Sequence, residues 1–436
     1  MIRKIKNLAN TDVKKKFISN FFSLSILQGV NLILPLITFP YLVRILGIEK
    51  YGLVVFAQAF ITYFTLIADY GFNLSGVREI SFYKNNSLKI TRIYNSILIA
   101  RLSLVLIGFV VLAFVVFSFD KFSSDWRLYF LTYGLVIGNA LFPTWFFQGM
   151  EKMKYITILS VIAKTIFTIF IFVLVKNPDD FLWVPMLNSL GYLVIGFISL
   201  IIINRQFNIP FKIQKKKYIK QQLQKGWFIF ISKVSTNLYT ATTTFVLGLV
   251  TNTIMVGYYA VGEKVIRIIV SLFSPFTQVI YPHVVQLVKK SSEEAELFLG
   301  KVIKYTLLVS LFILMISVLF SYPIFQLIFQ DNIDQSVLIF RILSPLIVII
   351  PLASVLFNIV LLAFKMDNYF FKIYLIGALV NIALLAILLF AFKFSIVGAA
   401  MSLLISESVI TGLAIRDLKK KNIKIFSIIK QTILSK

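Results

Sequence analysis

The sequence predicts an all-α polytopic membrane protein with about 12 transmembrane helices. Hydrophobic residues make up 59% of the chain and charged residues only 14%, and the mean hydropathy is +0.89. Long apolar runs alternate with short polar breaks. Because one membrane-spanning helix takes about 20 residues, 436 residues leave room for roughly 12 spans and for little else. A large soluble catalytic domain is therefore excluded.

The expected spans follow the apolar runs between charged or Pro-, Gly- and Asn-containing breaks. They are 17–40, 43–68, 93–118, 126–149, 155–175, 181–203, 226–250, 256–282, 298–320, 335–364, 370–392 and 395–415. The first run is too long for a signal-peptide core and no small-residue cleavage site follows it, so we expect it to be retained. Prolines inside these spans, where each permits a bend, include Pro35, Pro143, Pro275, Pro345 and Pro351.

The basic residues predict the orientation of the chain. With the N-terminus inside, 32 of the 44 Lys and Arg residues lie in cytoplasmic segments and 6 in outer segments. Basic residues near membrane ends resist translocation, so both termini are expected in the cytoplasm. The net charge of +26 then faces anionic lipid headgroups, and no nucleic acid partner is needed to explain it.

The longest polar break divides the chain into two similar halves. It covers 204–225 and lies between the sixth and seventh predicted spans. We expect two six-helix lobes around a central cavity, a transporter architecture in which the substrate path lies between the halves. The predicted parts are an N-terminal lobe 1–205, a cytoplasmic basic linker 206–222, a C-terminal lobe 223–418 and a basic cytoplasmic tail 419–436.

Polar side chains line one face of the first, second, seventh and eighth predicted helices. On the second helix, Gln58 and Asp69 belong to one stripe at helical spacing. Such stripes can pack on one another through hydrogen bonds. The charged residues among them favour a water-accessible cavity instead. The candidate substrate-binding residues are Lys164, Lys233, Lys264, Arg267, Gln28, Asn31, Gln58 and Asn237.

Six basic residues lie inside predicted helices. Arg101, Arg341 and Lys233 are near helix ends, where a basic side chain commonly reaches the lipid headgroups. Lys164 is about 13 Å from either end of its helix, too deep for this. We expect it to face the protein interior, where it either lines a cavity or pairs with an acidic residue, Glu407 or Glu263.

Acidic residues are fewer than basic ones in the membrane-embedded part. Glu263 and Arg267 are four residues apart and can neutralise one another, which leaves Lys264 over. The basic excess predicts a cavity that receives an anion. Asp69, Glu263 and Glu407 are the candidates for coupling to a proton or sodium gradient.

Several functions are disfavoured by residue content. The chain has no cysteine and a single histidine, so no thiol nucleophile and no cysteine- or histidine-based metal site is expected. We expect no catalytic residues and no cofactor. The outer segments are short, which disfavours a membrane polymerase or glycosyltransferase.

Four stretches resemble one family, the polysaccharide-transporter (O-antigen type) flippases of the multidrug/oligosaccharidyl-lipid/polysaccharide exporter superfamily. They are Leu46–Gly52 (LGIEKYG), Asp69–Phe72 with Gly76–Glu79 (DYGF, GVRE), Trp145–Met153 (WFFQGMEKM) and Gly257–Lys264 (GYYAVGEK). The resemblance implies two lobes around a cavity lined by the first, second, seventh and eighth helices. It also implies export of undecaprenyl-diphosphate-linked oligosaccharide repeat units.

The resulting expectation is a flippase in the cytoplasmic membrane of a bacterium, working by alternating access. Its partners would be the lipid-linked oligosaccharide, membrane lipids, and the polymerase and glycosyltransferases of a surface polysaccharide pathway. Three alternatives remain open. They are a drug/cation exporter, a lipid-linked peptidoglycan precursor flippase of the same superfamily, and a membrane polymerase or glycosyltransferase of the pathway.

Overall fold

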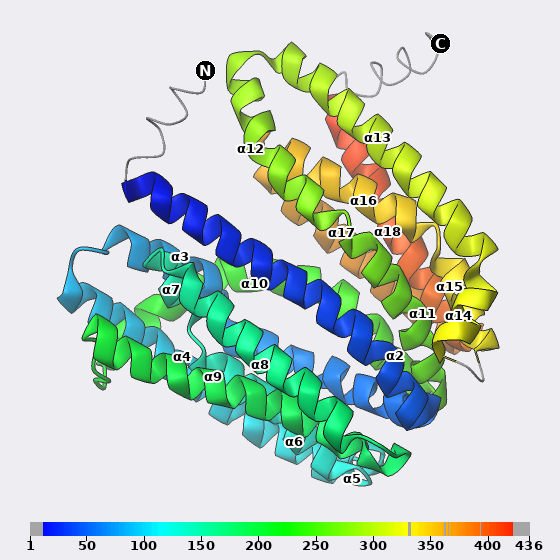
Figure 1. Cartoon of the computed structure of the whole chain (residues 1–436), viewed down its shortest axis with the longest axis horizontal. Coiled ribbons are helices and arrows are strands. Elements are labelled where there is room, and N and C mark those ends of the chain that lie inside the picture. The colour runs from blue at the N-terminus through cyan, green and yellow to red at the C-terminus, as the bar shows by residue number, and fades with distance from the viewer. Residues whose placement is uncertain (1–11, 330–332, 362, 365, 393, 422–436) are drawn as a thin grey trace. The chain divides into compact units, whose positions relative to one another are not determined.

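The structure of the chain, a computed structural model, describes residues 12–421 except 330–332, 362, 365 and 393 (Figure 1). It divides into two compact units. The first holds the residues up to Gly47 together with Ala57–Val234, and the second holds Ile48–Phe56 and the residues from Ser235 onward. The helices α2 and α10 each contribute to both units. The predicted lobe boundaries stay a prediction.

The first unit is built from helices that follow the predicted spans with different ends. They are α2 (Asp12–Asp69), α3 (Phe72–Phe82), α4 (Ser87–Ser118), α5 (Asp120–Ser123), α6 (Trp126–Leu141), α7 (Thr144–Gly149), α8 (Met153–Leu174), η1 (Pro178–Leu182), α9 (Trp183–Phe207) and the beginning of α10 (Lys216–Val250). Much of the predicted linker is therefore part of α10.

The second unit contains the rest of α10 and the helices that follow it. These are α11 (Thr253–Ser271), α12 (Ser274–Lys290), α13 (Ser292–Leu319), α14 (Ser321–Phe329), α15 (Asp334–Leu343), α16 (Leu346–Val355), η2 (Leu356–Leu361), α17 (Asp367–Ala386), η3 (Ile387–Ala391) and α18 (Ser395–Lys420). The stretches η2 and η3 are π-helical turns that continue α16 and α17.

Nine helical stretches in the described part of the chain are long and apolar enough to cross a membrane. The first of them, Ser25–Phe82, has 58 residues and contains a break at Gly47, so it is long enough for two crossings. The predicted seventh and eighth spans correspond to α10 and to α11 with α12, which are not among the nine. An all-helical membrane protein is confirmed, and the number twelve stays a prediction.

Several segments between the predicted spans are helical, and several predicted helix interiors are broken. Residues 41 and 42 continue α2 as helix, and the segments 69–92 and 321–334 between predicted spans contain α3 and α14. Pro143, Pro275 and Pro345 were expected inside continuous helices but lie at breaks or at the first turn of a helix. Proline lacks a backbone N–H, so it is tolerated at a helix start, where that group would have no partner.

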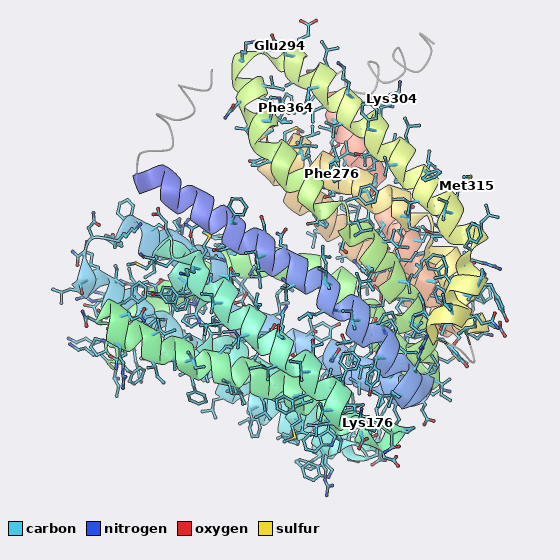
Figure 2. The ribbon with its side chains drawn as sticks, viewed as in Figure 1. Lys176, Phe276, Glu294, Lys304, Met315 and Phe364 are labelled. Carbon is cyan, nitrogen blue, oxygen red and sulfur yellow. The ribbon has the colours of Figure 1, made fainter. Side chains whose placement is uncertain are left out.

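Large apolar side chains cover the outside of both units. On α13 the exposed residues include Leu308, Phe312 and Met315, the last of which is labelled in Figure 2. On α4 they include Phe114 and Phe117, each more than 60% exposed. A helix that presents such a face to water would be unstable, whereas lipid chains satisfy it.

The Trp145 segment packs α7 against α3 inside the first unit. Trp145, Phe146 and Phe147 are completely buried. A Cβ added at Gly76 of α3 would lie 2.8 Å from the Trp145 ring, and one at Gly149 would lie 2.7 Å from the Ile80 side chain. The WFFQG stretch therefore serves the packing of α7 on α3, because the two glycines leave room for the large side chains of Trp145 and Ile80.

A second motif pair forms a close helix crossing inside the second unit. A Cβ added at Gly52 of α2 would lie 2.0 Å from the Thr253 carbonyl oxygen, and one at Gly257 of α11 would lie 2.2 Å from the Ile48 carbonyl oxygen. Backbone approaches of this kind are typical of glycine at membrane helix contacts. The LGIEKYG and GYYA stretches are thus contact partners.

We expect Gly257→Ala to lower the thermal stability of the purified protein. Alanine favours an isolated helix over glycine by about 1 kcal/mol, but here its methyl group meets the α2 backbone and should cost about 1–3 kcal/mol net. Gly412→Ala on α18 is the control, because nothing lies within 4 Å of its Cβ position. An equal or higher melting temperature for Gly257→Ala than for Gly412→Ala would contradict the crossing.

Candidate functional site

A cavity of about 350 Å³ lies within the first unit, between α2, α6, α8 and α9. Its polar lining comprises three threonine hydroxyls, two asparagine amides, one tyrosine and one lysine. The lining residues are Leu34, Pro35, Thr38, Thr65, Leu135, Asn139, Lys164, Phe167, Thr168, Asn188 and Tyr192. Apart from Lys164, no side chain in this lining carries a charge.

Lys164 reaches this cavity from the middle of α8. Its Nζ donates a hydrogen bond to the side-chain oxygen of Asn31 on α2. Within the described residues Lys164 makes no ion pair. The pairing of Lys164 with Glu407 or Glu263 joins different units and stays untested. A lysine held by a neutral acceptor keeps its charge available to an anion in the cavity.

Close packing of α6 on α9 positions the opposite wall of the cavity. A Cβ at Gly138 would lie 2.5 Å from the Tyr192 carbonyl carbon, and one at Gly134 would lie 2.7 Å from the Ser189 Cβ. The adjacent residue Asn139 and the α9 residue Tyr192 therefore enter the same cavity from helices in direct backbone contact. Small residues at a membrane helix contact permit this approach.

An ion-pair network centred on Asp69 adjoins the cavity. Asp69 Oδ1 lies 3.3 Å from Arg101 Nη2, and Asp69 Oδ2 lies 2.9 Å from Lys233 Nζ. Asn73 Nδ2 also donates to Asp69 Oδ2, at 2.8 Å. Arg101 Nη2 donates to Asn139 Oδ1 at 3.1 Å. Asn139 thus belongs both to the cavity wall and to this network, so the two features are continuous.

The expectation that Arg101 and Lys233 reach the lipid headgroups is wrong. The Arg101 side chain is only 1% exposed, and both cations contact the Asp69 carboxylate. A charge inside a membrane protein that finds an opposite charge avoids the cost of an unpaired buried ion. Arg341 also has an internal contact, since its Nε donates to Ser321 Oγ at 2.9 Å.

The second unit holds the other charged candidates. Arg267 Nη2 lies 2.9 Å from Glu263 Oε1, so this i,i+4 pair forms as predicted. Lys264, which follows Glu263 directly on α11, is exposed and makes no hydrogen bond or ion pair with the described residues. Glu407 on α18 is buried, with 4% of its surface exposed. The side chain of the predicted residue Asn237 lies outside the described residues.

Gln28 and Gln58 are half-buried on α2 and do not line the cavity. Threonine hydroxyls on the same stripe bond within the helix, as when Thr62 donates to the Gln58 carbonyl oxygen at 2.8 Å. The structure therefore joins Asn31 with Lys164, Asp69 with Lys233, and Glu263 with Arg267.

Sequence reasoning missed the part of the site that comes from α6 and α9. Asn139, Asn188 and Tyr192 line the cavity but were not singled out. A signal was available, because Asn139 and Asn188 are carboxamides within apolar runs, where polar groups are costly unless they have partners. The predicted polar stripes lie on the first, second, seventh and eighth helices and do not include α6 or α9.

The family of the chain follows from its sequence. Residues 17–288 match the family model described as "Polysaccharide biosynthesis protein". The chain belongs to this family. A relative from Escherichia coli (strain K12) named "Putative O-antigen transporter" is 27% identical over 394 residues, covering 90% of this chain and 94% of the relative. A relative of the same name from Shigella dysenteriae is 28% identical and covers 92% of this chain and 99% of the relative.

Solved structures share the fold. The lipid II flippase MurJ in an inward closed conformation has a TM-score of 0.67 at 13% identity, covering 96% of this chain and 90% of that chain. An inward-facing multidrug resistance MATE family transporter of the MOP superfamily has a TM-score of 0.64 at 13% identity, covering 94% and 99%. At this identity the likeness establishes the fold alone.

We expect Asp69→Asn to destabilise the protein strongly. The change leaves Arg101 buried without its carboxylate, and breaking such a pair costs about 3–5 kcal/mol. Glu79→Gln is the matched control, because it breaks a pair with Lys225 whose lysine is 41% exposed, worth at most about 1 kcal/mol. Thermal unfolding in detergent measures both. Similar melting temperatures for the two variants would show that the Asp69 network contributes no more than a surface pair.

Proposed function

We propose that the protein is a flippase that moves undecaprenyl-diphosphate-linked oligosaccharide repeat units from the inner to the outer leaflet of a bacterial cytoplasmic membrane. The observation that supports this most is Lys164, a cation at mid-helix depth facing a cavity of otherwise neutral polar groups. The relatives named as O-antigen transporters match nearly the whole chain and favour the same function.

The chemistry of such a substrate fits this lining. A diphosphate carries about two negative charges, and transferring it bare through hydrocarbon would cost many kcal/mol. A lysine ammonium and polar hydrogen-bonding groups lower this barrier. Sugars need donors and acceptors and an aromatic surface, which Asn139, Asn188 and Tyr192 supply together.

The ion pairs show which candidate cations are already neutralised by a carboxylate and which keep their charge available to a substrate. Arg101, Lys233 and Arg267 each contact a carboxylate, so part of their field is neutralised. Among the described residues Lys164 has no carboxylate partner, whereas the charge of Lys264 is influenced by the neighbouring carboxylate of Glu263. We therefore assign the diphosphate to Lys164 first, and Lys264 and Arg267 of the second unit are separate candidates.

The proposed cycle is alternating access with no covalent chemistry. An inside-negative potential favours outward movement of negative charge by roughly 2.3 kcal/mol per charge per 100 mV. Where an ion gradient also contributes, Asp69, Glu263 and Glu407 are the candidate carboxylates, and two cations already hold Asp69. Glu263 is likewise engaged by Arg267.

The alternatives are less well supported. A drug or cation exporter would normally need carboxylates facing its cavity, whereas the cavity of the first unit carries only a lysine. A peptidoglycan precursor flippase is supported only by the likeness in fold to a lipid II flippase. The sequence relatives that cover 90% or more of this chain are instead named as O-antigen transporters.

We expect Lys164→Gln to reduce surface glycan by about ten- to a hundredfold at unchanged protein level. A hydrogen bond to a charged group contributes about 1.5–3 kcal/mol, and each 1.4 kcal/mol corresponds to about tenfold in rate. Lys164→Arg should retain part of the activity because the charge is kept. The measurement is glycan display in a strain whose own flippase is deleted.

Lys176→Gln is the control, since this lysine caps the end of α8 by donating to the Phe172 carbonyl oxygen and is exposed. It should leave glycan display unchanged. Full glycan display by Lys164→Gln would refute the role of the cavity lysine, and full display by Lys264→Gln would refute a separate role of Lys264. Export of cationic dyes without any transport of diphosphate lipid in proteoliposomes would refute the proposed substrate.

A further inference from the structure

An apolar groove of about 430 Å³ lies in the second unit and shares no lining residue with the polar cavity of the first unit. It is formed by α12, α13 and α16 with η2, and α12 runs beside α13 (Figure 1). Its lining residues are Phe273, Phe276, Thr277, Ile280, Phe298, Lys301, Val302, Tyr305, Thr306, Val309, Pro351, Val355 and Ile359. Phe276 on α12 is labelled in Figure 2.

Three interruptions of regular helix meet at this groove. The break between α11 and α12 places Phe273 in its wall. Pro351 interrupts the hydrogen bonding of α16, and Ile359 lies in the π-helical turn η2. Irregular turns in membrane helices carry a cost and are frequent at functional sites. All three irregular turns line the same groove. This indicates that the groove is a binding feature and not simply a space left between packed helices.

One end of the groove carries a positive charge. Lys301 is the charged residue of the lining, it is exposed, and it makes no hydrogen bond or ion pair with the described residues. It belongs to the segment 283–304, which holds four basic residues and is predicted to lie at the cytoplasmic surface. From Lys301 the wall continues as apolar and aromatic side chains.

The length of the groove matches one leaflet. Along α13 the lining extends from Lys301 to Val309, with Phe298 one turn before Lys301, and these eight residue steps at 1.5 Å each make about 12 Å. The hydrocarbon core of a bilayer is about 30 Å thick, so one leaflet is about half of that. A polyprenyl chain of the proposed substrate is much longer than this, whereas an ordinary acyl chain is of this length.

We propose that this groove binds an anionic phospholipid of the inner leaflet, with its acyl chain along α13 and its phosphate at Lys301. The groove matches the parts of a lipid. Its single cation suits the phosphate of the headgroup, and its apolar wall suits an acyl chain within one leaflet. A single lysine also suits a phosphodiester with one negative charge better than a diphosphate. The inference does not depend on which substrate the protein transports.

The test uses the purified full-length protein in detergent with added phosphatidylglycerol, phosphatidylcholine or polyprenyl phosphate. Thermal unfolding against lipid concentration gives an apparent affinity, because a ligand that binds the folded state raises the melting temperature. We expect phosphatidylglycerol to stabilise the protein more than phosphatidylcholine does. Lys301→Gln should weaken the phosphatidylglycerol affinity by about tenfold or more.

Matched variants separate the two parts of the groove. Lys372→Gln removes an exposed lysine outside the lining and should leave the lipid response unchanged. Val309→Trp fills the groove and should abolish stabilisation by phosphatidylglycerol. Phe312 lies outside the lining on the exposed face of α13, so Phe312→Trp should leave this stabilisation unchanged. Native mass spectrometry of the same variants should show the retained lipid lost only from Val309→Trp and Lys301→Gln.

Equal phosphatidylglycerol responses in Lys301→Gln and Lys372→Gln would overturn the assignment of the headgroup. Equal responses in Val309→Trp and Phe312→Trp would overturn the assignment of the chain. A larger Lys301-dependent effect of polyprenyl phosphate than of phosphatidylglycerol would assign the groove to the polyprenyl lipid and refute the phospholipid.

Discussion

A charge enclosed within a membrane protein has to be met by an opposite charge, and Arg101 is where this constraint acts most strongly. Its guanidinium on α4 is almost completely buried and contacts Asp69 on α2 and Asn139 on α6. Lys233 on α10 contacts the same carboxylate. One acidic residue therefore ties α2, α4 and α10 together, and Asn139 adds α6. Losing the carboxylate would leave two cations to repel one another, so the packing of these helices depends on it.

The same constraint separates structural cations from one that is available to a ligand. Moving Lys233 onto a substrate would break an ion pair, whereas moving Lys164 would exchange only its neutral acceptor on Asn31. The Lys164–Asn31 hydrogen bond has one charged partner, whereas a hydrogen bond from Lys164 to a phosphate oxygen has two, which adds charge–charge attraction. A phosphate oxygen can thus replace the Asn31 oxygen with a gain. The uncharged surroundings of Lys164 are what make it suited to transient binding.

The sequence predicted features that depend on local spacing, and it failed where distant segments decide. Apolar run length predicted the helices, and the four-residue spacing predicted the Glu263–Arg267 pair. The Asp69–Arg101 pair joins residues 32 apart, and only the packing of α2 on α4 brings them together. Proline leaves a backbone carbonyl of the preceding turn without its helical hydrogen bond. Whether Pro275 bends a helix or begins one depends on which neighbouring groups satisfy that carbonyl. Those neighbours are set by the tertiary structure, so the sequence periodicity cannot predict them.

The glycines and the interrupted helices divide the second unit into stiff and compliant parts. At the Gly52–Gly257 crossing the backbones are in contact, so no side chains can rearrange between them, and sliding would create overlap. Around Leu272–Phe273, Pro351 and η2 the regular hydrogen-bond ladder is already interrupted, and bending there breaks fewer bonds. A deformation of this unit therefore costs least at its interrupted helices. The interruptions at Phe273, Pro351 and η2 line the apolar groove, so an occupant of the groove would stiffen these positions.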